Sequence, residues 1–168
     1  MFSGKTSFLL QRLHKLHDLG FNVVYLNHAI DTRGDGVSDF SSHSSYTRQF
    51  TCPFDTVKTA TLDDVSDYTQ YDVIAIDEAQ FFDTLPRFIT RALESNLHII
   101  VGGLSGTYTQ EPFGSILQLI PKADDITILH AYCKPCLASN KQMVSAPFTR
   151  KLCPNGPDGP IVDIGGGD

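Results

Sequence analysis

The sequence predicts an α/β fold in which a parallel β-sheet is flanked by helices. Two continuous apolar runs, residues 71–77 and 97–103, have the composition of strands that are buried on both faces. Helical patterns alternate with these runs, and such alternation is typical of a parallel sheet. The chain has 168 residues, 41% of them hydrophobic, which is enough for one domain with a substantial core.

The first expected element is a helix over residues 4–19, in which apolar side chains recur at helical spacing and Gly20 marks the end. A strand over residues 21–27 follows. Residues 31–51 are rich in Ser, Asp and Gly and poor in aliphatic side chains, so we expect an exposed loop or hairpin arm there.

The same reading continues through the second half of the chain. The patterns predict, in order, a strand at 71–77, a helix at 84–96 with Pro86 in its first turn, a strand at 97–103, a short helix at 114–120 and a strand at 125–132. Residues 153–168 are mostly Gly, Pro and Asp and indicate a long loop rather than core. We therefore expect a main domain over residues 1–131 and a smaller segment over 132–168.

Charge and cysteine content narrow the functional classes. The net charge is −6, and no basic run exceeds two residues, so we expect no nucleic-acid partner. No stretch approaches 18 consecutive apolar residues, and we expect no membrane association. The close pair in C-K-P-C (133–136) has the spacing of an intracellular metal or redox motif, so a cytoplasmic location is expected.

A phosphate-binding motif opens the chain. Gly4-Lys5-Thr6 matches the end of the pattern G-x-x-x-x-G-K-[ST], and the helix that follows would aim backbone N–H groups at phosphate oxygens. A chance match is the alternative. If the motif is real, its first glycine and the preceding strand would lie before residue 1.

A second motif lies at the end of the apolar strand 71–77. Asp77 and Glu78 follow four apolar residues, where an aspartate can hold Mg²⁺ and a neighbouring glutamate can act as a base. The alternative is an acidic strand end in a solvated loop. Together with Gly4-Lys5-Thr6, the pair favours a P-loop nucleotide enzyme, whether a kinase or an ATPase.

The C-K-P-C motif contains two possible zinc ligands, Cys133 and Cys136. Structural zinc sites need four ligands, and no second CxxC follows. The alternative is a pair of unpaired thiols at a turn.

These motifs belong to a longer series that resembles the type II thymidine kinases, the cellular and poxvirus-like zinc-containing group. The series reads MFSGKTS (1–7), DTR (31–33), IDEAQFF (76–82), GLSGTYTQEPFGSILQLIP (103–121), CKPC (133–136), PFTRKL (147–152) and IGGGD (164–168). The resemblance implies a P-loop NTPase-like parallel sheet flanked by helices, with a small zinc- and lasso-type C-terminal subdomain. It also implies that the chain is truncated at both ends, since the family has a strand and Gly-Pro before Met1 and a second CxxC after Asp168.

The resemblance implies an ATP-dependent thymidine kinase of nucleotide salvage and DNA precursor synthesis, with Mg²⁺ held by Thr6 and Asp77 and with Glu78 as the catalytic base. The residues implied to bind ATP and its phosphates are Met1, Phe2, Ser3, Gly4, Lys5, Thr6, Asp31, Thr32, Arg33, Asp77, Glu78, Ala79 and Gln80. The residues implied to bind thymidine are Met1, Phe81, Leu104, Tyr108, Thr149, Ile161, Val162, Asp163, Ile164 and Gly165.

Three further properties follow from the resemblance. Cys133 and Cys136 would form an incomplete structural Zn²⁺ site, the small-molecule partners would be thymidine and ATP, and the assembly would be a homo-tetramer. Two alternatives stay open: a truncated, inactive paralogue, and a P-loop ATPase that does not act on nucleosides.

Overall fold

The computed structural model describes residues 3–31, 52–65, 67–140 and 142–150. Its centre is a sheet of four parallel strands in the order β2-β1-β3-β4. These strands are β1 (Val23–His28), β2 (Asp55–Thr59), β3 (Val73–Asp77) and β4 (His98–Val101). The predicted α/β fold with a parallel sheet is confirmed.

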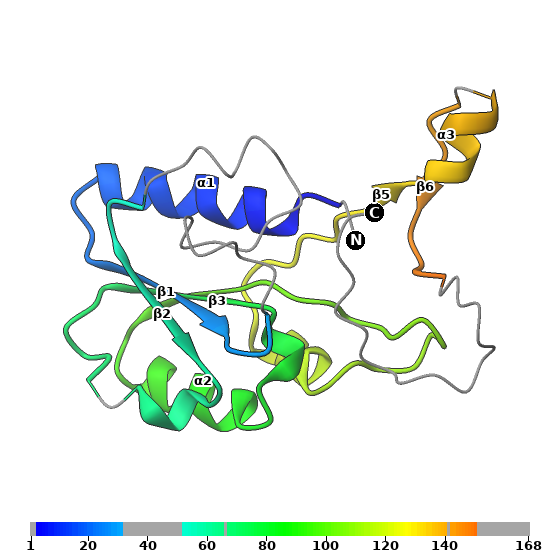
Figure 1. Ribbon diagram of the computed structural model, residues 1–168. Coiled ribbons are helices and arrows are strands. Elements are labelled where there is room, and N and C mark those ends of the chain that lie inside the picture. The colour runs from blue at the N-terminus through cyan, green and yellow to red at the C-terminus, as the bar shows by residue number, and fades with distance from the viewer. Residues whose placement is uncertain (1–2, 32–51, 66, 141, 151–168) are drawn as a thin grey trace.

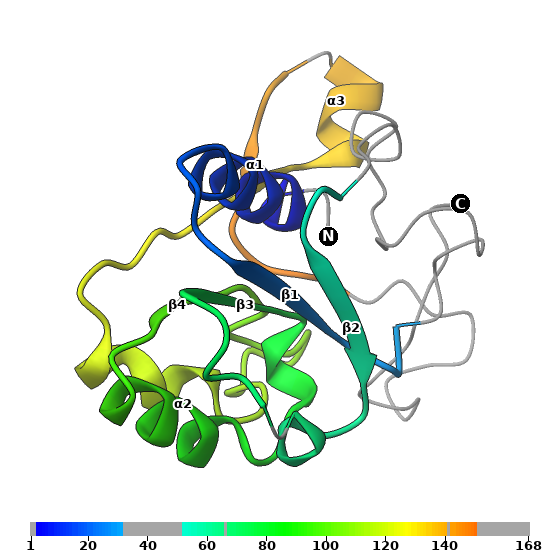
Figure 2. The same cartoon turned by 90° about the vertical axis from the view of Figure 1, so that its left-hand side faces the viewer.

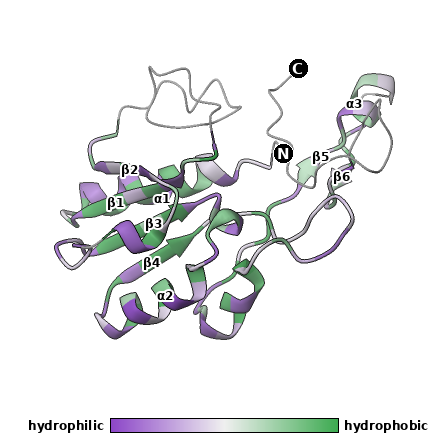
Figure 3. Ribbon diagram, turned by 60° about the horizontal axis from the view of Figure 1, so that its bottom comes forward, coloured by the Kyte–Doolittle hydropathy of each residue, from purple (hydrophilic) through white to green (hydrophobic). Residues whose placement is uncertain are grey.

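Two helices cover opposite faces of this sheet (Figures 1 and 2). Helix α1 (Lys5–Asp18) packs on β1 and β3, whereas α2 (Leu85–Glu94) packs on the other face near β4. Strands β1 and β3 lie in the middle of the sheet, so their side chains are buried on both faces. This explains why both strands begin with apolar residues, while their polar residues, Asn27, His28 and Asp77, lie at the carboxyl ends; Figure 3 shows both green and purple along these strands.

Side chains alternate between two cores. On the α1 face, Leu9 and Leu13 meet Tyr25 and Ala75. The α2 face contains Val24, Leu26, Ile74 and Ile76 from the strands, together with Phe88 from α2 and other residues. Tyr25, Ala75 and Asp77 therefore lie on the same face, because residues two apart in a strand point the same way.

The structure corrects one predicted strand. Only Ala131–Tyr132 (β5) of the expected strand 125–132 is extended in a ladder, and it pairs antiparallel with β6 (Ser145–Ala146). Ile126 and Ile128 are exposed, the latter by 76%. The sequence predicts a strand over all of 125–132, but in the described part of the chain the residues before Ala131 have no neighbouring strand to supply ladder hydrogen bonds.

Short helices complete the fold. The helix expected at 114–120 is a 3₁₀ helix, η4 (Ile116–Lys122), which includes Pro121 and follows Gly114 with its positive φ of 59°. Two 3₁₀ turns, η2 (Leu62–Asp64) and η3 (Ala79–Phe81), and the helix α3 (Lys134–Asn140) had no counterpart in the sequence analysis, nor had β2. Among the described residues, no helix has both the length and the apolar character needed to cross a membrane.

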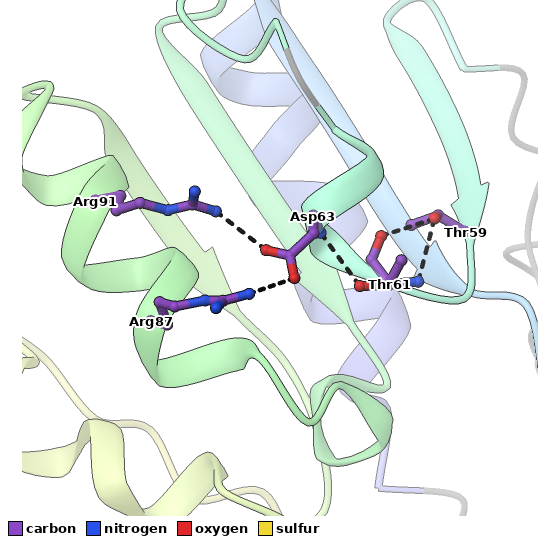
Figure 4. Close-up of polar contacts among 5 residues, drawn as sticks. All are labelled: Thr59, Thr61, Asp63, Arg87 and Arg91. Carbon is purple, nitrogen blue, oxygen red and sulfur yellow. Dashed lines mark hydrogen bonds and ion pairs between the residues drawn. The ribbon is translucent and has the colours of Figure 1, made fainter.

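A polar cluster ties η2 to α2 on the outside of the sheet (Figure 4). Asp63 accepts hydrogen bonds from Arg87 and, at 3.2 Å, from Arg91, while its own backbone N–H donates to the hydroxyl of Thr61. The two arginine side chains are largely exposed. Each ion pair therefore contributes less than about 1 kcal/mol, and the cluster fixes the η2 turn rather than the core.

Candidate functional site

The first turn of α1 meets the carboxyl end of β3. The Thr6 hydroxyl donates a hydrogen bond of 2.8 Å to the Oδ2 atom of Asp77. Gly4, with φ of 76°, turns the chain into the helix without a side-chain cap, which leaves N–H groups of the first turn available to a ligand. The start of the first helix therefore faces the carboxyl end of the strand that carries Asp77.

Asp77 is the centre of the polar contacts at this edge. Its side chain is only 2% exposed. Oδ2 accepts from Thr6 and from the Tyr25 hydroxyl at 2.9 Å, and Oδ1 accepts from the backbone N–H of Glu78 at 2.9 Å. Burial raises the pKa of Asp77, and the neighbouring Glu78 raises it further, while the three hydrogen bonds act in the opposite direction.

Sequence reasoning missed Tyr25. Burial raises the pKa of its hydroxyl well above the usual value, and the charges of Asp77, Glu78 and Asp31 raise it further. The hydroxyl therefore stays protonated and acts as a donor to Asp77. The only sequence signal was a tyrosine inside an apolar strand, which by itself indicates core packing.

Glu78 sits beside this cluster in a strained backbone conformation, with φ of 50°. Its Oε2 atom accepts a hydrogen bond of 2.6 Å from the side-chain amide of Gln80. The amide oxygen of Gln80 in turn accepts from the backbone N–H of Leu104 at 2.9 Å. Gln80 is 4% exposed, so it connects the predicted base to a predicted pocket residue from within the protein.

An aromatic cluster adjoins the acidic groups. The ring of Phe81 is half-buried and lies 5.6 Å from His28 and 5.5 Å from Phe113 between ring centroids. Phe82 is buried beneath it and contacts His28 edge to face at 4.6 Å. Burial lowers the pKa of His28, although its hydrogen bond to the Ala60 backbone and the charge of Asp83 oppose that shift. Phe81 thus presents one ring at the edge of the site.

The structure brings together several of the residues expected to bind ligands. Asp31 is buried and close enough to affect the pKa of Tyr25. Ser3 and Gly4 lie at the start of α1, whereas Tyr108 is half-buried and Thr149 is exposed. The other residues that the resemblance implies to bind ligands lie outside the described residues: Met1, Phe2, Thr32, Arg33, Ile161, Val162, Asp163, Ile164 and Gly165.

The oxygen atoms at this edge suit Mg²⁺, a hard cation that prefers such ligands. Thr6 and Asp77 provide a hydroxyl and a carboxylate already in contact. Asn27 is paired in register with Asp77 and is buried, and its Oδ1 has no hydrogen-bond partner within the described ranges. An unpaired buried carbonyl costs about 1–3 kcal/mol, so a donor from a ligand or from metal-bound water would explain it.

The two cysteines of C-K-P-C lie where β5 ends and α3 begins. Hydrogen bonds from the backbone and side chain of Cys136 lower the pKa of Cys133, while the Cys133 sulfur raises the pKa of Cys136. The two sulfurs are therefore neighbours. Within residues 3–31, 52–65, 67–140 and 142–150, no group of three or more metal-ligating side chains forms.

Comparisons with known proteins identify a single family. The family profile described as "Thymidine kinase" matches residues 1–168. The "Thymidine kinase" of Myxoma virus (strain Uriarra) is 34% identical over 170 residues, covering 100% of this chain and 85% of that protein. The "Thymidine kinase" of Choristoneura fumiferana entomopoxvirus is 33% identical over 171 residues, covering 100% and 86%.

A cellular relative shows the same similarity. The human "Thymidine kinase, cytosolic" is 31% identical over 169 residues, which is 100% of this chain and 65% of the human protein. Viral and cellular relatives thus align along the whole chain, including the segment that joins Thr6 to Asp77. From the profile match and these identities, the chain belongs to the thymidine kinase family.

Proposed function

We propose that this protein transfers the γ-phosphoryl group of ATP to the 5′-hydroxyl of thymidine. The observation that carries the proposal is the contact of Thr6 with Asp77, with Glu78 next in the chain, in a member of the thymidine kinase family. Phosphoryl transfer needs positioning, charge neutralisation and a base for the acceptor hydroxyl. This edge of the sheet offers a residue for each task.

The phosphates would bind at the start of α1, in a P-loop-like arrangement. Backbone groups from Ser3 to Thr6 would surround the phosphates, and Lys5 would neutralise part of their charge. Thr6 and Asp77 would hold Mg²⁺, as the family's use of ATP as co-substrate suggests. Bound there, Mg²⁺ would supply positive charge against the phosphates during transfer.

Glu78 would accept the proton of the thymidine 5′-hydroxyl. Its carboxylate is half-buried and held by Gln80, which limits its rotation. Phe81 would pack against the base, and its fixed contacts with His28 and Phe113 support a defined ring orientation. The contacts of Met1, Tyr108, Thr149 and residues 161–165 with thymidine stay predictions from the resemblance.

The test is a thymidine-dependent reaction. The purified chain with ATP and Mg²⁺ is expected to form thymidine monophosphate and one ADP per thymidine consumed, measured by chromatography. ADP release that does not depend on thymidine would instead indicate an ATPase. Nucleotide binding without either product would indicate an inactive paralogue.

Assembly and location also stay proposals. We propose a homo-tetramer, as the resemblance implies. Exposed apolar residues such as Ile126, Ile128 and Phe148 support a contact with other copies. A cytoplasmic location would keep the thiols of Cys133 and Cys136 reduced.

We propose that Cys133 and Cys136 form half of a structural zinc site. Their neighbouring sulfurs suit Zn²⁺, and the lowered pKa of Cys133 favours the thiolate that metals bind. Two ligands hold zinc weakly compared with four. After dialysis, metal analysis is therefore expected to find clearly less than one zinc per chain, and Cys133→Ser should remove what remains. One tightly held zinc per chain would contradict this and show that other residues complete the site.

A further inference from the structure

The Oδ2 atom of Asp77 accepts hydrogen bonds from two different elements. Thr6 donates from the first turn of α1, and Tyr25 donates from β1. A carboxylate oxygen offers about two lone-pair positions, so these two donors saturate Oδ2. Oδ1 accepts only the Glu78 N–H among the described residues and keeps a lone pair with which it could bind a metal ion.

Tyr25 is held where it makes this contact. Strand register pairs Tyr25 with Ala75, so its side chain points to the same face as Asp77 and reaches along the strand to it. The residue is 1% exposed and packs with Leu9, Leu13 and Ala75 under α1. Packing under α1 therefore holds the Tyr25 ring in place, and this sets the position of its hydroxyl.

We infer that Tyr25 is a positioning residue of the metal–nucleotide site, whose hydroxyl fixes the rotation of the Asp77 carboxylate and thereby the oxygen that faces the metal. This inference rests on the proposed function, because it takes Asp77 as a magnesium ligand. The terminal torsion of aspartate is broad, so packing alone does not select one orientation. Tyr25 and Thr6 together on Oδ2 do select one.

The test compares Tyr25→Phe with the unchanged chain. Phenylalanine keeps the ring in the core and removes only the donor. Binding of Mn²⁺ in the presence of ADP is measured from the electron paramagnetic resonance signal of free Mn²⁺. Tyr25→Phe is expected to weaken Mn²⁺ binding about tenfold, the lower end for a hydrogen bond to a charged group. Binding of ADP without metal, followed by calorimetry, is expected to stay within about twofold of wild type.

Tyr71→Phe is the matched control. The Tyr71 hydroxyl also donates to a carboxylate, at 2.7 Å to Asp55, but away from the site, and this bond raises the pKa of Tyr71 to about 12. The control should bind Mn²⁺ like wild type. A thermal unfolding curve shows whether each variant is folded.

The outcomes separate the inference from the proposed function. If folded Tyr25→Phe binds Mn²⁺ as tightly as wild type, or if Tyr71→Phe is weakened equally, Tyr25 has no positioning role. The inference is also overturned if Tyr25→Phe weakens ADP binding without metal as much as it weakens binding with Mn²⁺. Tyr25 would then act only through packing. If wild type itself binds no Mn²⁺ with ADP, the proposed function fails and the inference with it.

Discussion

Replacing Glu78 by glutamine is expected to lower kcat by roughly 10²–10⁴-fold, the usual contribution of a general base. The affinities for ATP and thymidine are expected to stay nearly unchanged. Glutamine has the shape of glutamate, and its amide oxygen can still accept the hydrogen bond from Gln80. Only the capacity to take a proton is removed. Steady-state rates give kcat, and calorimetry with each substrate gives the affinities.

Glu94→Gln is the control for this experiment. Glu94 is an exposed residue at the end of α2, on the face of the sheet opposite α1. The same chemical change there should leave kcat unaltered. Equal losses of affinity and turnover in Glu78→Gln would contradict the role of a base and indicate a structural one, for example support of the strained backbone at this residue.

Gly114→Ala is expected to destabilise the protein by roughly 2–5 kcal/mol, from the strain of a positive φ and from overpacking. Gly114 has φ of 59°, and an added Cβ would lie 2.1 Å from the carbonyl oxygen of Gln80. That carbonyl cannot easily move, because the Gln80 side chain is buried and bridges Glu78 and Leu104. The midpoint of thermal unfolding should fall by roughly 5–15 °C for a chain of this size.

Gly20→Ala separates the two causes. Gly20 also has a positive φ, 92°, but an added Cβ there meets no atom within 4 Å. Gly20→Ala should therefore lower the free energy of unfolding only by the roughly 1–2 kcal/mol that backbone strain costs. Equal losses of stability in the two variants would show that the contact with Gln80 is relieved by movement of the chain. Because Gln80 holds Glu78, Gly114→Ala should also lower kcat more than Gly20→Ala does.

Much of the site could be predicted from local patterns. Gly4, Lys5 and Thr6 stand at the start of a predicted helix, and Asp77 and Glu78 stand at the end of a predicted strand, so each motif marks the end of an element. Their meeting at 2.8 Å between Thr6 and Asp77 follows from a general property of parallel sheets, in which ligand sites lie beyond the carboxyl ends of the strands. The resemblance implied that Thr6 and Asp77 share Mg²⁺, and the direct hydrogen bond between them is a finding of the structure.

The wrong strand at 125–132 shows the limit of such patterns. Its Ile, Leu and Tyr content is compatible with a strand, although it lacks the continuous apolar run of 71–77. β3 has neighbours on both sides, β1 and β4, and exchanges ladder hydrogen bonds with both. Most of 125–132 has no such neighbour in the described part of the chain, and a strand without one leaves its backbone to water.

By itself, the sequence determined the alternation of helices and buried strands, the ends at which Thr6, Asp77 and Glu78 lie, and the family resemblance. Only the tertiary structure decided that Tyr25 holds Asp77, that Gln80 supports Glu78, and that Gly114 has no room for a side chain. The physical reason is the range of the interactions. Periodicity and capping act within a few residues, whereas Tyr25 and Asp77 lie on strands whose pairing chain order does not specify, and Gly114 and Gln80 are brought together only by the folded chain. Gln80 and Glu78 are two residues apart, but their bond depends on the 3₁₀ turn and on the burial of Gln80.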